Sequence, residues 1–214
     1  MSNGIVNMNV KLLSITPDAE RLIERAGRTA YQSFRHQKDG SEKTFIRKIT
    51  KKGHGSVLEH AYATFEISGV SRVFTHQLIR HRLCSFTQRS QRYVDERDMN
   101  YIEPDSVSNK EEAHSVFIEF MESARKSYGR LKELGIRNED ARFVLPNAVE
   151  TQIVVTANLR EWRHIVKLRC TPAAQWEIRR VTMEILRKLK EVAPTAFEDF
   201  EIDEGKDRIR MIAL

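Results

Sequence analysis

The segment from Arg80 to Tyr93, RHRLCSFTQRSQRY, concentrates side chains that bind anions. Its arginines stand among hydroxyl and amide side chains, together with one histidine and one cysteine. Guanidinium groups bind phosphate through paired N–H donors and keep their charge at physiological pH. Two kinds of site fit this chemistry: a stripe that follows a nucleic-acid backbone, and a pocket for small phosphorylated molecules.

Arg80 and Arg82 can bind the same ligand only if the chain leaves the helical conformation near them. Successive helical residues are separated by about 100°, so these two arginines cannot both face one ligand on a regular helix. We therefore expect the helix capped by Ser71 to end near Arg82 and the chain to turn there. Backbone and side chains could then converge on one anion. A solvated basic helix end is the alternative that the residues alone leave open.

Ser90 and Cys84 are the hydroxyl and the thiol of this segment that could act as nucleophiles. The sequence around Ser90 offers no His–Asp pair to activate it, so we interpret it as a substrate ligand. His81 and Arg82 could lower the pKa of Cys84 and make it a reactive thiolate. The favoured interpretation of Cys84 is a small, partly buried apolar residue.

The whole chain has the composition of a globular protein. It has 214 residues, of which 40% are hydrophobic and 31% charged. No apolar run approaches the roughly 20 residues that span a bilayer, so no membrane span is expected. The N-terminal stretch MSNGIVNMNVKLLSI lacks the pattern of an export signal, which favours a cytoplasmic protein. Cys84 and Cys170 show no C-x-x-C spacing, so we predict neither a metal site nor a dithiol pair.

The charge of the chain favours anionic partners. The formal net charge is +6 although the segment FEDFEIDEG near the C-terminus is acidic. Such a charge attracts nucleic acids and nucleotides alike. Charge therefore does not decide between the two kinds of site.

Periodicity predicts an α+β fold, with a central, mostly antiparallel sheet flanked by long helices. We expect one domain over residues 1–214, because the sequence has no repeat and no linker. Alternation predicts strands or extended chain at 8–15, 61–68, 86–94 and 149–156. Helical spacing and capping residues predict helices at 16–33 (Thr16 as N-cap), 41–52, 71–82, 110–134, 138–145, 158–169 and after Pro172.

The chain resembles the flavin-dependent thymidylate synthases. The pattern R-H-R, seven residues, then S in RHRLCSFTQRS fits the signature of that family without a gap. The segments HGSVLEH, ARFVLP and TANLREWRHIVKLRCTPAAQWEI are similar to further family segments, and the likeness covers most of the chain. The resemblance implies conversion of dUMP to dTMP, with 5,10-methylenetetrahydrofolate as one-carbon donor and FAD, reduced by NADPH, as cofactor. It also implies a homotetramer with sites between subunits.

The resemblance also implies which residues bind each ligand. FAD would be bound by Ser56, Arg80, His81, Arg82, Gln88, Asn158, Leu159, Arg160 and His164. The nucleotide dUMP would be bound by Gln77, Leu78, Ile79, Arg80, Gln88, Arg89, Ser90, Gln91, Arg92, Arg142 and Arg169. Gln88, His164 and Ala173 depart from residues found in some members, which weakens individual flavin contacts.

Arg169 has the catalytic role in this assignment. Its permanent charge beside the uracil ring would stabilise the negative charge that develops as the pyrimidine is activated. By spacing alone, Arg169 is an ordinary arginine in the last turn of a helix.

Two other functions fit parts of the sequence. A non-catalytic nucleic-acid-binding protein would use the stretch from Arg80 to Arg97 to follow phosphates, with Phe86 and Tyr93 stacking on bases. Acidic residues within that stretch argue against it, and we predict no nucleic-acid partner. Thymidylate synthesis through a Cys84 thiolate is the second.

Overall fold

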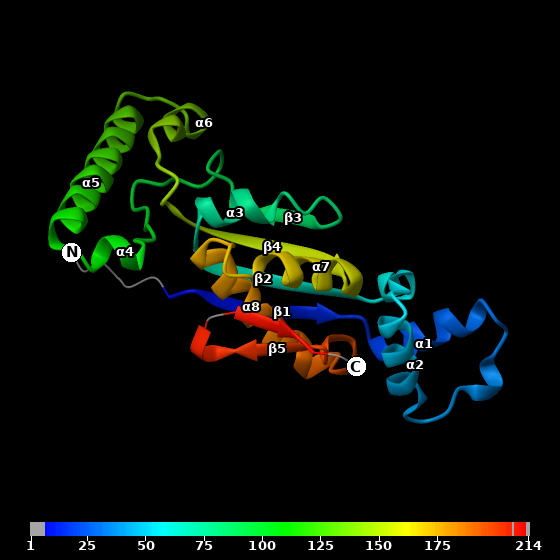
Figure 1. The fold of residues 1–214 in the computed structure, drawn as a ribbon. Helices are drawn as coiled ribbons and strands as arrows, with labels where there is room; N and C mark the ends of the chain where they lie inside the picture. Colours follow the sequence, from blue (N-terminus) through cyan, green and yellow to red (C-terminus); the bar gives the residue numbers. More distant parts are fainter. Residues whose placement is uncertain (1–6, 207, 213–214) are drawn as a thin grey trace. The chain divides into compact units, whose positions relative to one another are not determined.

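The structure, a computed structural model, describes residues 7–206 and 208–212 (Figure 1). Its internal contacts divide the chain into two compact units, each assembled from segments that are far apart in the sequence. The α5 unit contains residues 7–9, Ile67–Gln77 and Thr87–Ile153, and the α7 unit contains Val10–Glu66, Leu78–Phe86 and the chain from Val154 onward. The single-domain expectation stays a prediction.

Four strands form a sheet in the order β1-β2-β4-β3. They are β1 (Asn9–Ile15), β2 (Tyr62–Ser71), β3 (Ser85–Gln88) and β4 (Glu150–Asn158). The amide of Leu159 donates to the Ala61 carbonyl at 2.8 Å, and the amide of Arg72 donates to the Val149 carbonyl at 3.2 Å. The start of β2 therefore lies beside the end of β4, so the two strands are antiparallel. The α+β class with an antiparallel sheet is confirmed.

The alternation of β2 and β4 decides which side chains enter the core. Ala63 and Phe65 on β2, and Val155 and Ala157 on β4, are buried, while the residues between them are partly exposed. Helix α7 (Leu159–Arg169) packs on this face. The indole of Trp162 donates to the Ala63 carbonyl at 3.0 Å, and its ring meets Phe65 edge-on at 5.1 Å. Trp162 is fully buried and belongs to the core.

The α7 unit surrounds this core with helices. Helix α8 packs against α7, and α1 packs against α2 and the 3₁₀ segment η2. These elements are α1 (Ala19–Thr29), α2 (Ser41–Lys51), η2 (Gly55–His60) and α8 (Trp176–Val192). The acidic C-terminal segment, where no element was expected, forms an antiparallel pair of short strands, β5 (Phe200–Asp203) and β6 (Arg208–Met211).

The α5 unit is built around the long helix α5 (Glu111–Glu133). Its buried cluster contains Met99, Met121, Ala124 and Val149. Gly135, with a left-handed φ of 82°, follows the end of the helix. The other helical segments of this unit are α3 (Arg72–Leu78), α4 (Asp105–Ser108), α6 (Asn138–Ala141) and η3 (Arg142–Val144).

Three local expectations were wrong. Thr16 does not cap α1: its hydroxyl accepts a hydrogen bond from the Tyr62 amide at 2.9 Å, and Asp18 stands at the helix start. Helix α3 ends at Leu78, before the R-H-R sequence, because the chain turns twice there. Strand β3 ends at Gln88, because the Ser90 carbonyl accepts from the amides of the next turn.

No helix within the described residues has both the length and the apolar character needed to cross a membrane.

Candidate functional site

Two successive turns follow α3 and hold the R-H-R sequence. The amide of His81 donates to the Leu78 carbonyl at 3.1 Å, and the amide of Cys84 donates to the His81 carbonyl at 3.2 Å. His81 is buried by this path, while Arg80 and Arg82 remain exposed on either side of it. The expected turn is confirmed, although it begins several residues earlier than predicted.

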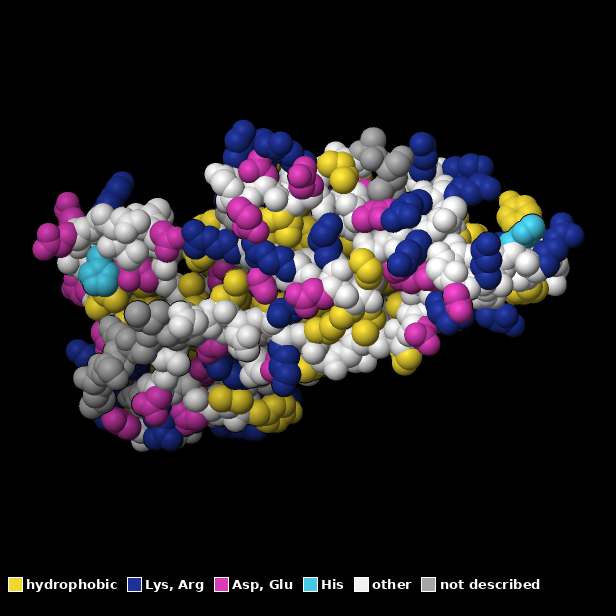
Figure 2. Space-filling view, turned by 90° about the horizontal axis from the view of Figure 1, so that it is seen from below, with side chains coloured by type: hydrophobic (Ala, Val, Ile, Leu, Met, Phe, Trp, Pro, Cys, Tyr) yellow, Lys and Arg dark blue, Asp and Glu magenta, His cyan; other side chains and the backbone are white. Residues whose placement is uncertain are grey.

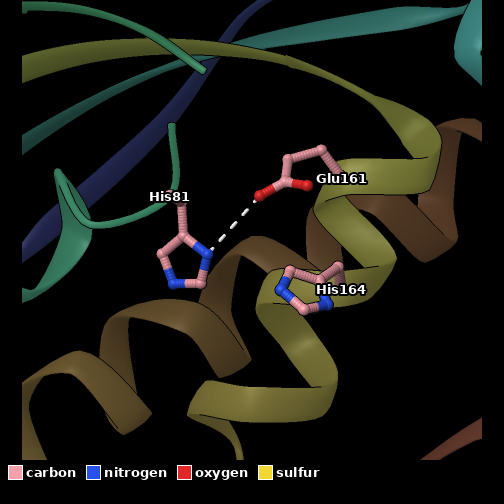
Figure 3. A group of neighbouring side chains, drawn as sticks. All are labelled: His81, Glu161 and His164. Atoms are coloured by element: carbon pink, nitrogen blue, oxygen red, sulfur yellow. Dashed lines mark ion pairs between the residues drawn. The ribbon is translucent and has the colours of Figure 1, made fainter. Parts of the chain in front are cut away.

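His81 stands between a carboxylate and a guanidinium that both come from α7. Figure 3 shows His81 with the carboxylate, Glu161, and with the nearby His164. Its Nδ1 lies 3.4 Å from Oε1 of Glu161, in the first turn of the helix. Its Nε2 lies 3.0 Å from Nε of Arg169, in the last turn. The ring of His164 meets the His81 ring edge-on at 5.8 Å. The structure therefore brings together three residues that the sequence assigned to ligand binding, and adds Glu161.

Burial and neighbouring charges keep His81 neutral. Burial, together with the charges of Arg169 and His164, lowers the pKa of His81 to about 4. Burial also raises the pKa of Glu161, against the opposing charges of His164 and Arg160. At neutral pH, His81 is thus an uncharged imidazole that can accept one hydrogen bond and donate one.

The start of α7 is fixed by its predicted cap. The side-chain oxygen of Asn158 accepts from the Glu161 amide at 2.8 Å, which satisfies one of the free N–H groups of the first turn. Leu159 is buried, and the exposed Arg160 forms an ion pair with Glu59. The capping role of Asn158 is confirmed, and its role as a ligand stays a prediction.

Two cavities border η2 in the α7 unit. One, of about 520 Å³, includes Ser56 and lies against α1 and α2. The other, of about 240 Å³, lies against α7 and is lined by Thr50, Gly53, Gly55, Leu58, Arg160, Arg163, His164 and Lys167. A Cβ at position 55 would lie 3.3 Å from Nε of Arg160, so glycine leaves room for this arginine. The second cavity has the cationic lining that a phosphate group requires.

The α5 unit holds the predicted substrate residues that follow β3. Arg89 donates to Oε2 of Glu150 at 2.8 Å, and Glu96 lies 3.5 Å away. Nε of Arg89 and Nε2 of Gln91 are buried and have no hydrogen-bond partner within the described part of the chain. Buried donors of this kind normally have an acceptor, so they indicate a place for an anionic or carbonyl-bearing ligand.

The remaining predicted residues of this unit make local contacts. Ser90 accepts from the Arg92 amide at 3.2 Å, and Gln88 donates to Thr75 and Thr151 at 3.1 and 3.3 Å. The side chains of Arg92, Arg142 and Gln77 donate to Oε2 of Glu139, the Glu139 carbonyl and the Val73 carbonyl, respectively. Leu78, the last residue of α3, and Ile79, which follows it, belong to the α7 unit.

The basic stretch from Arg80 to Arg97 is not a continuous positive surface. Arg89, Arg92 and Arg97 form ion pairs with Glu150, Glu139 and Asp95, respectively. On the face drawn in Figure 2, lysines and arginines lie among acidic side chains. A stripe that follows phosphates needs unpaired cations, so the nucleic-acid alternative is not supported.

Cys84 lacks the environment of a reactive thiolate. Burial raises the pKa of its thiol to about 12, and the charge of Glu161 adds to this effect. A thiol with so high a pKa is protonated at neutral pH. The hypothesis of a Cys84 nucleophile is therefore not supported.

Glu161 is the site residue that sequence reasoning missed. It stands three residues after the cap Asn158, where a glutamate is common in the first turn of helices. A glutamate at this position is explained locally, so the sequence did not indicate its contact with His81, 80 residues earlier in the chain.

Known proteins resemble this chain in sequence and in fold. The family model described as thymidylate synthase complementing protein, Thy1, matches residues 11–195. A protein of Geobacter sulfurreducens named flavin-dependent thymidylate synthase is 47% identical, over 90% of this chain and 86% of its own. One of Mycolicibacterium gilvum with the same name is 42% identical, over 85% of this chain and 79% of its own. The crystal structure of thymidylate synthase X from Helicobacter pylori with FAD and dUMP has a TM-score of 0.77 at 26% identity, and covers 90% of this chain and 98% of its own.

Proposed function

This chain belongs to the family of flavin-dependent thymidylate synthases, and we propose that its own residues convert dUMP to dTMP with FAD as the cofactor. The observation that carries the proposal is the contact between Arg169 and the neutral His81 at the R-H-R turn. It places a permanent positive charge beside the signature sequence of the family.

The donor set of the α7 unit fits FAD. Arg160, His164 and Lys167 line the cavity of about 240 Å³ beside Gly55, and they suit the pyrophosphate of a dinucleotide. Ligand cavities usually measure about 300–1,000 Å³, so this one suits a part of FAD rather than all of it. Ser56, Arg80, His81, Arg82, Asn158 and Leu159 are the other proposed FAD residues of this unit, and Gln88 is the one in the α5 unit. When bound, FAD supplies the reducing equivalents of the reaction.

The α5 unit supplies donors for dUMP. The unpaired Nε of Arg89 and Nε2 of Gln91 suit the oxygen atoms of a phosphate or a pyrimidine. Ser90 offers a hydroxyl in the turn that follows β3, in agreement with its interpretation as a ligand rather than a nucleophile. Gln77, Gln88, Arg92 and Arg142 complete the proposed substrate residues of this unit, and Leu78, Ile79 and Arg80 are proposed for dUMP from the α7 unit.

Arg169 is the proposed catalytic residue. A guanidinium cannot lose its proton under working conditions, so its charge is available to stabilise negative charge on the pyrimidine. Its Nε is hydrogen-bonded to His81, which orients the plane of the guanidinium. Pre-orientation matters, because a fixed charge requires no reorganisation when the reaction occurs.

The proposal includes 5,10-methylenetetrahydrofolate as the one-carbon donor and NADPH as the reductant. It also includes a homotetramer in the cytoplasm, without a nucleic-acid partner. Light scattering of the purified protein should give the mass of four chains. A monomer at working concentration would contradict that part of the proposal.

A purified sample tests the function directly. We expect a yellow protein with the absorbance of bound flavin, which releases tritium from C5 of labelled dUMP when folate and NADPH are present. A colourless protein that binds RNA with a steep dependence on salt would instead support a nucleic-acid-binding function.

A further inference from the structure

We propose that Glu161 is a positioning residue, which acts through His81 to hold the guanidinium of Arg169 in one orientation. The expected effect of Glu161 on catalysis rests on the proposed function. The arrangement Glu161–His81–Arg169 is here called the relay.

The hydrogen positions of the relay follow from its donors. Arg169 can only donate, so Nε2 of His81 must be the acceptor of the 3.0 Å contact. A neutral imidazole carries one proton, which must therefore lie on Nδ1. Nδ1 faces Oε1 of Glu161 at 3.4 Å, where the carboxylate attracts the N–H group. The carboxylate thus favours the tautomer that accepts from Arg169.

Burial strengthens this effect. Only 6% of Glu161 and 5% of His81 are exposed. A buried carboxylate is unfavourable unless nearby donors or positive charges compensate it. The Asn158 cap uses the backbone amide of Glu161 and leaves its side chain to face the imidazole. A cap alone therefore does not account for a glutamate here.

The same residues could be taken for a metal site. Ligand atoms of His81, Glu161 and His164 lie within 4.8 Å of one another. To bind a cation through Nδ1, however, His81 would have to carry its proton on Nε2. That proton would face the Nε–H of Arg169, so two donors would oppose each other at 3.0 Å. The contact with Arg169 therefore favours the relay over a metal.

Two substitutions test the relay in the full chain loaded with FAD. In Glu161→Ala, we expect kcat to fall about 10- to 100-fold, the size typical of losing a residue that orients a functional side chain, while the KM for dUMP changes less than about threefold. Glu161→Gln keeps an oxygen acceptor and a similar volume, so we expect it to recover part of the loss. A role in packing alone would give full recovery in Glu161→Gln, so an incomplete recovery distinguishes the carboxylate charge from packing.

The tautomer of His81 gives a readout that needs no turnover. In protein with ¹⁵N-labelled histidine, we expect the His81 proton on Nδ1, with the signals assigned by their absence in His81→Asn. In Glu161→Ala we expect a mixture of tautomers. Glu24→Ala is the matched control, since Glu24 is also a buried carboxylate in the α7 unit and is held by Arg28. It should lower stability and leave the His81 signals unchanged.

Several outcomes would overturn the relay. An active wild-type enzyme whose Glu161→Ala variant keeps both its kcat and the His81 tautomer would do so. Stoichiometric binding of Zn²⁺ that is lost in His164→Ala would also do so, because it would assign the cluster to a metal. If the His81 tautomer changed as expected between the wild type and Glu161→Ala, but the wild type made no thymidylate, the proposed function and the catalytic consequence would be overturned together. The control of the tautomer by Glu161 would still stand.

Discussion

The Arg169 side chain carries a permanent positive charge and is held in place by a hydrogen bond to His81. Its Nε–H contacts His81, and burial together with the charge of Arg80 lowers the pKa of its guanidinium. A lowered pKa means that the site stabilises the cation less than water does, so an anion nearby would be favoured. The residue is suited to stabilising a transition state that carries negative charge.

Two substitutions of Arg169 should separate the effect of its charge on kcat from the effect of its hydrogen bond to His81. Arg169→Ala should lower kcat at least 100-fold while FAD remains bound, since one transition-state donor contributes about 10²–10³ in rate. Arg169→Lys keeps a charge but lacks the planar donor to His81, so it should recover only part of the rate. Steady-state kinetics and the flavin absorbance measure both effects. The control is Arg187→Ala, which should keep the wild-type kcat. Arg187 lies on α8 and forms ion pairs with Glu184 and Glu204.

The pH dependence of stability should report the burial of His81. The pKa of His81 falls from 6.5 to about 4 on folding. Below pH 6.5 the unfolded chain therefore binds a proton that the folded chain does not bind. The stabilisation is fully present above about pH 6.5 and is lost as the pH falls toward 4, by roughly 3 kcal/mol at most.

Urea denaturation between pH 7 and 4 checks this prediction. His81→Asn cannot titrate, so its free energy of unfolding should fall less steeply with decreasing pH than that of the wild type. The difference between the two curves separates His81 from carboxylates that titrate in the same range. Parallel curves would contradict a buried, neutral His81.

At the scale of elements, two glycines make a matched pair. Gly69 on β2 has a φ of 66°, and a Cβ there would lie 2.2 Å from the Asn7 carbonyl oxygen. Gly129 lies inside α5, and a Cβ there would meet no atom within 4 Å. One position requires glycine, and the other tolerates any helix-forming residue.

Alanine substitutions should therefore have opposite signs. Gly69→Ala should lower the free energy of unfolding by more than about 1 kcal/mol, from the left-handed backbone and the clash together. Gly129→Ala should raise it by about 0.5–1 kcal/mol, the usual gain in an exposed helix. Thermal and urea denaturation measure both. Equal effects of the two changes would show that the backbone at Gly69 is not constrained.

Local sequence signals predicted the elements whose stabilisation is local. The alternation around Phe65 predicted β2, and Ser71 and Asn158 were recognised as caps because a cap bonds within three residues. The strands β5 and β6 were missed, because each has only four residues and several charged side chains. Their antiparallel pairing includes cross-strand ion pairs such as Asp203 with Arg210, which sequence periodicity does not report.

The sequence predicted residues of the candidate site only where they belong to a motif of the family. The R-H-R signature identified His81, and resemblance identified Arg169. The contact of Glu161 with His81 and that of Arg89 with Glu150 join residues far apart in the chain. Such pairs follow from tertiary packing, so no local pattern could have indicated them.

At the scale of the whole molecule, a buried ion pair joins α7 to the C-terminal segment. Arg163 donates to both carboxylate oxygens of Asp199 at 2.6 and 2.5 Å, and also to the Ala196 carbonyl. Its guanidinium lies over the Phe200 ring at 4.7 Å. Lys190 on α8 donates to carbonyls of the same segment. Asp199, whose role the sequence left open, therefore links the segment around residues 196–200 to helix α7.

Removing one member of this pair should destabilise the whole molecule. Arg163→Met leaves Asp199 buried without its partner, so the free energy of unfolding should fall by about 3–5 kcal/mol. Arg47→Met is the matched control, because Arg47 forms a solvent-exposed pair with the neighbouring Glu198 and should change the free energy of unfolding far less. The double change Arg163→Met with Asp199→Leu removes both charges and should recover part of the loss. If Arg163→Met unfolded at the same urea concentration as Arg47→Met, the pair would not fasten the C-terminal segment.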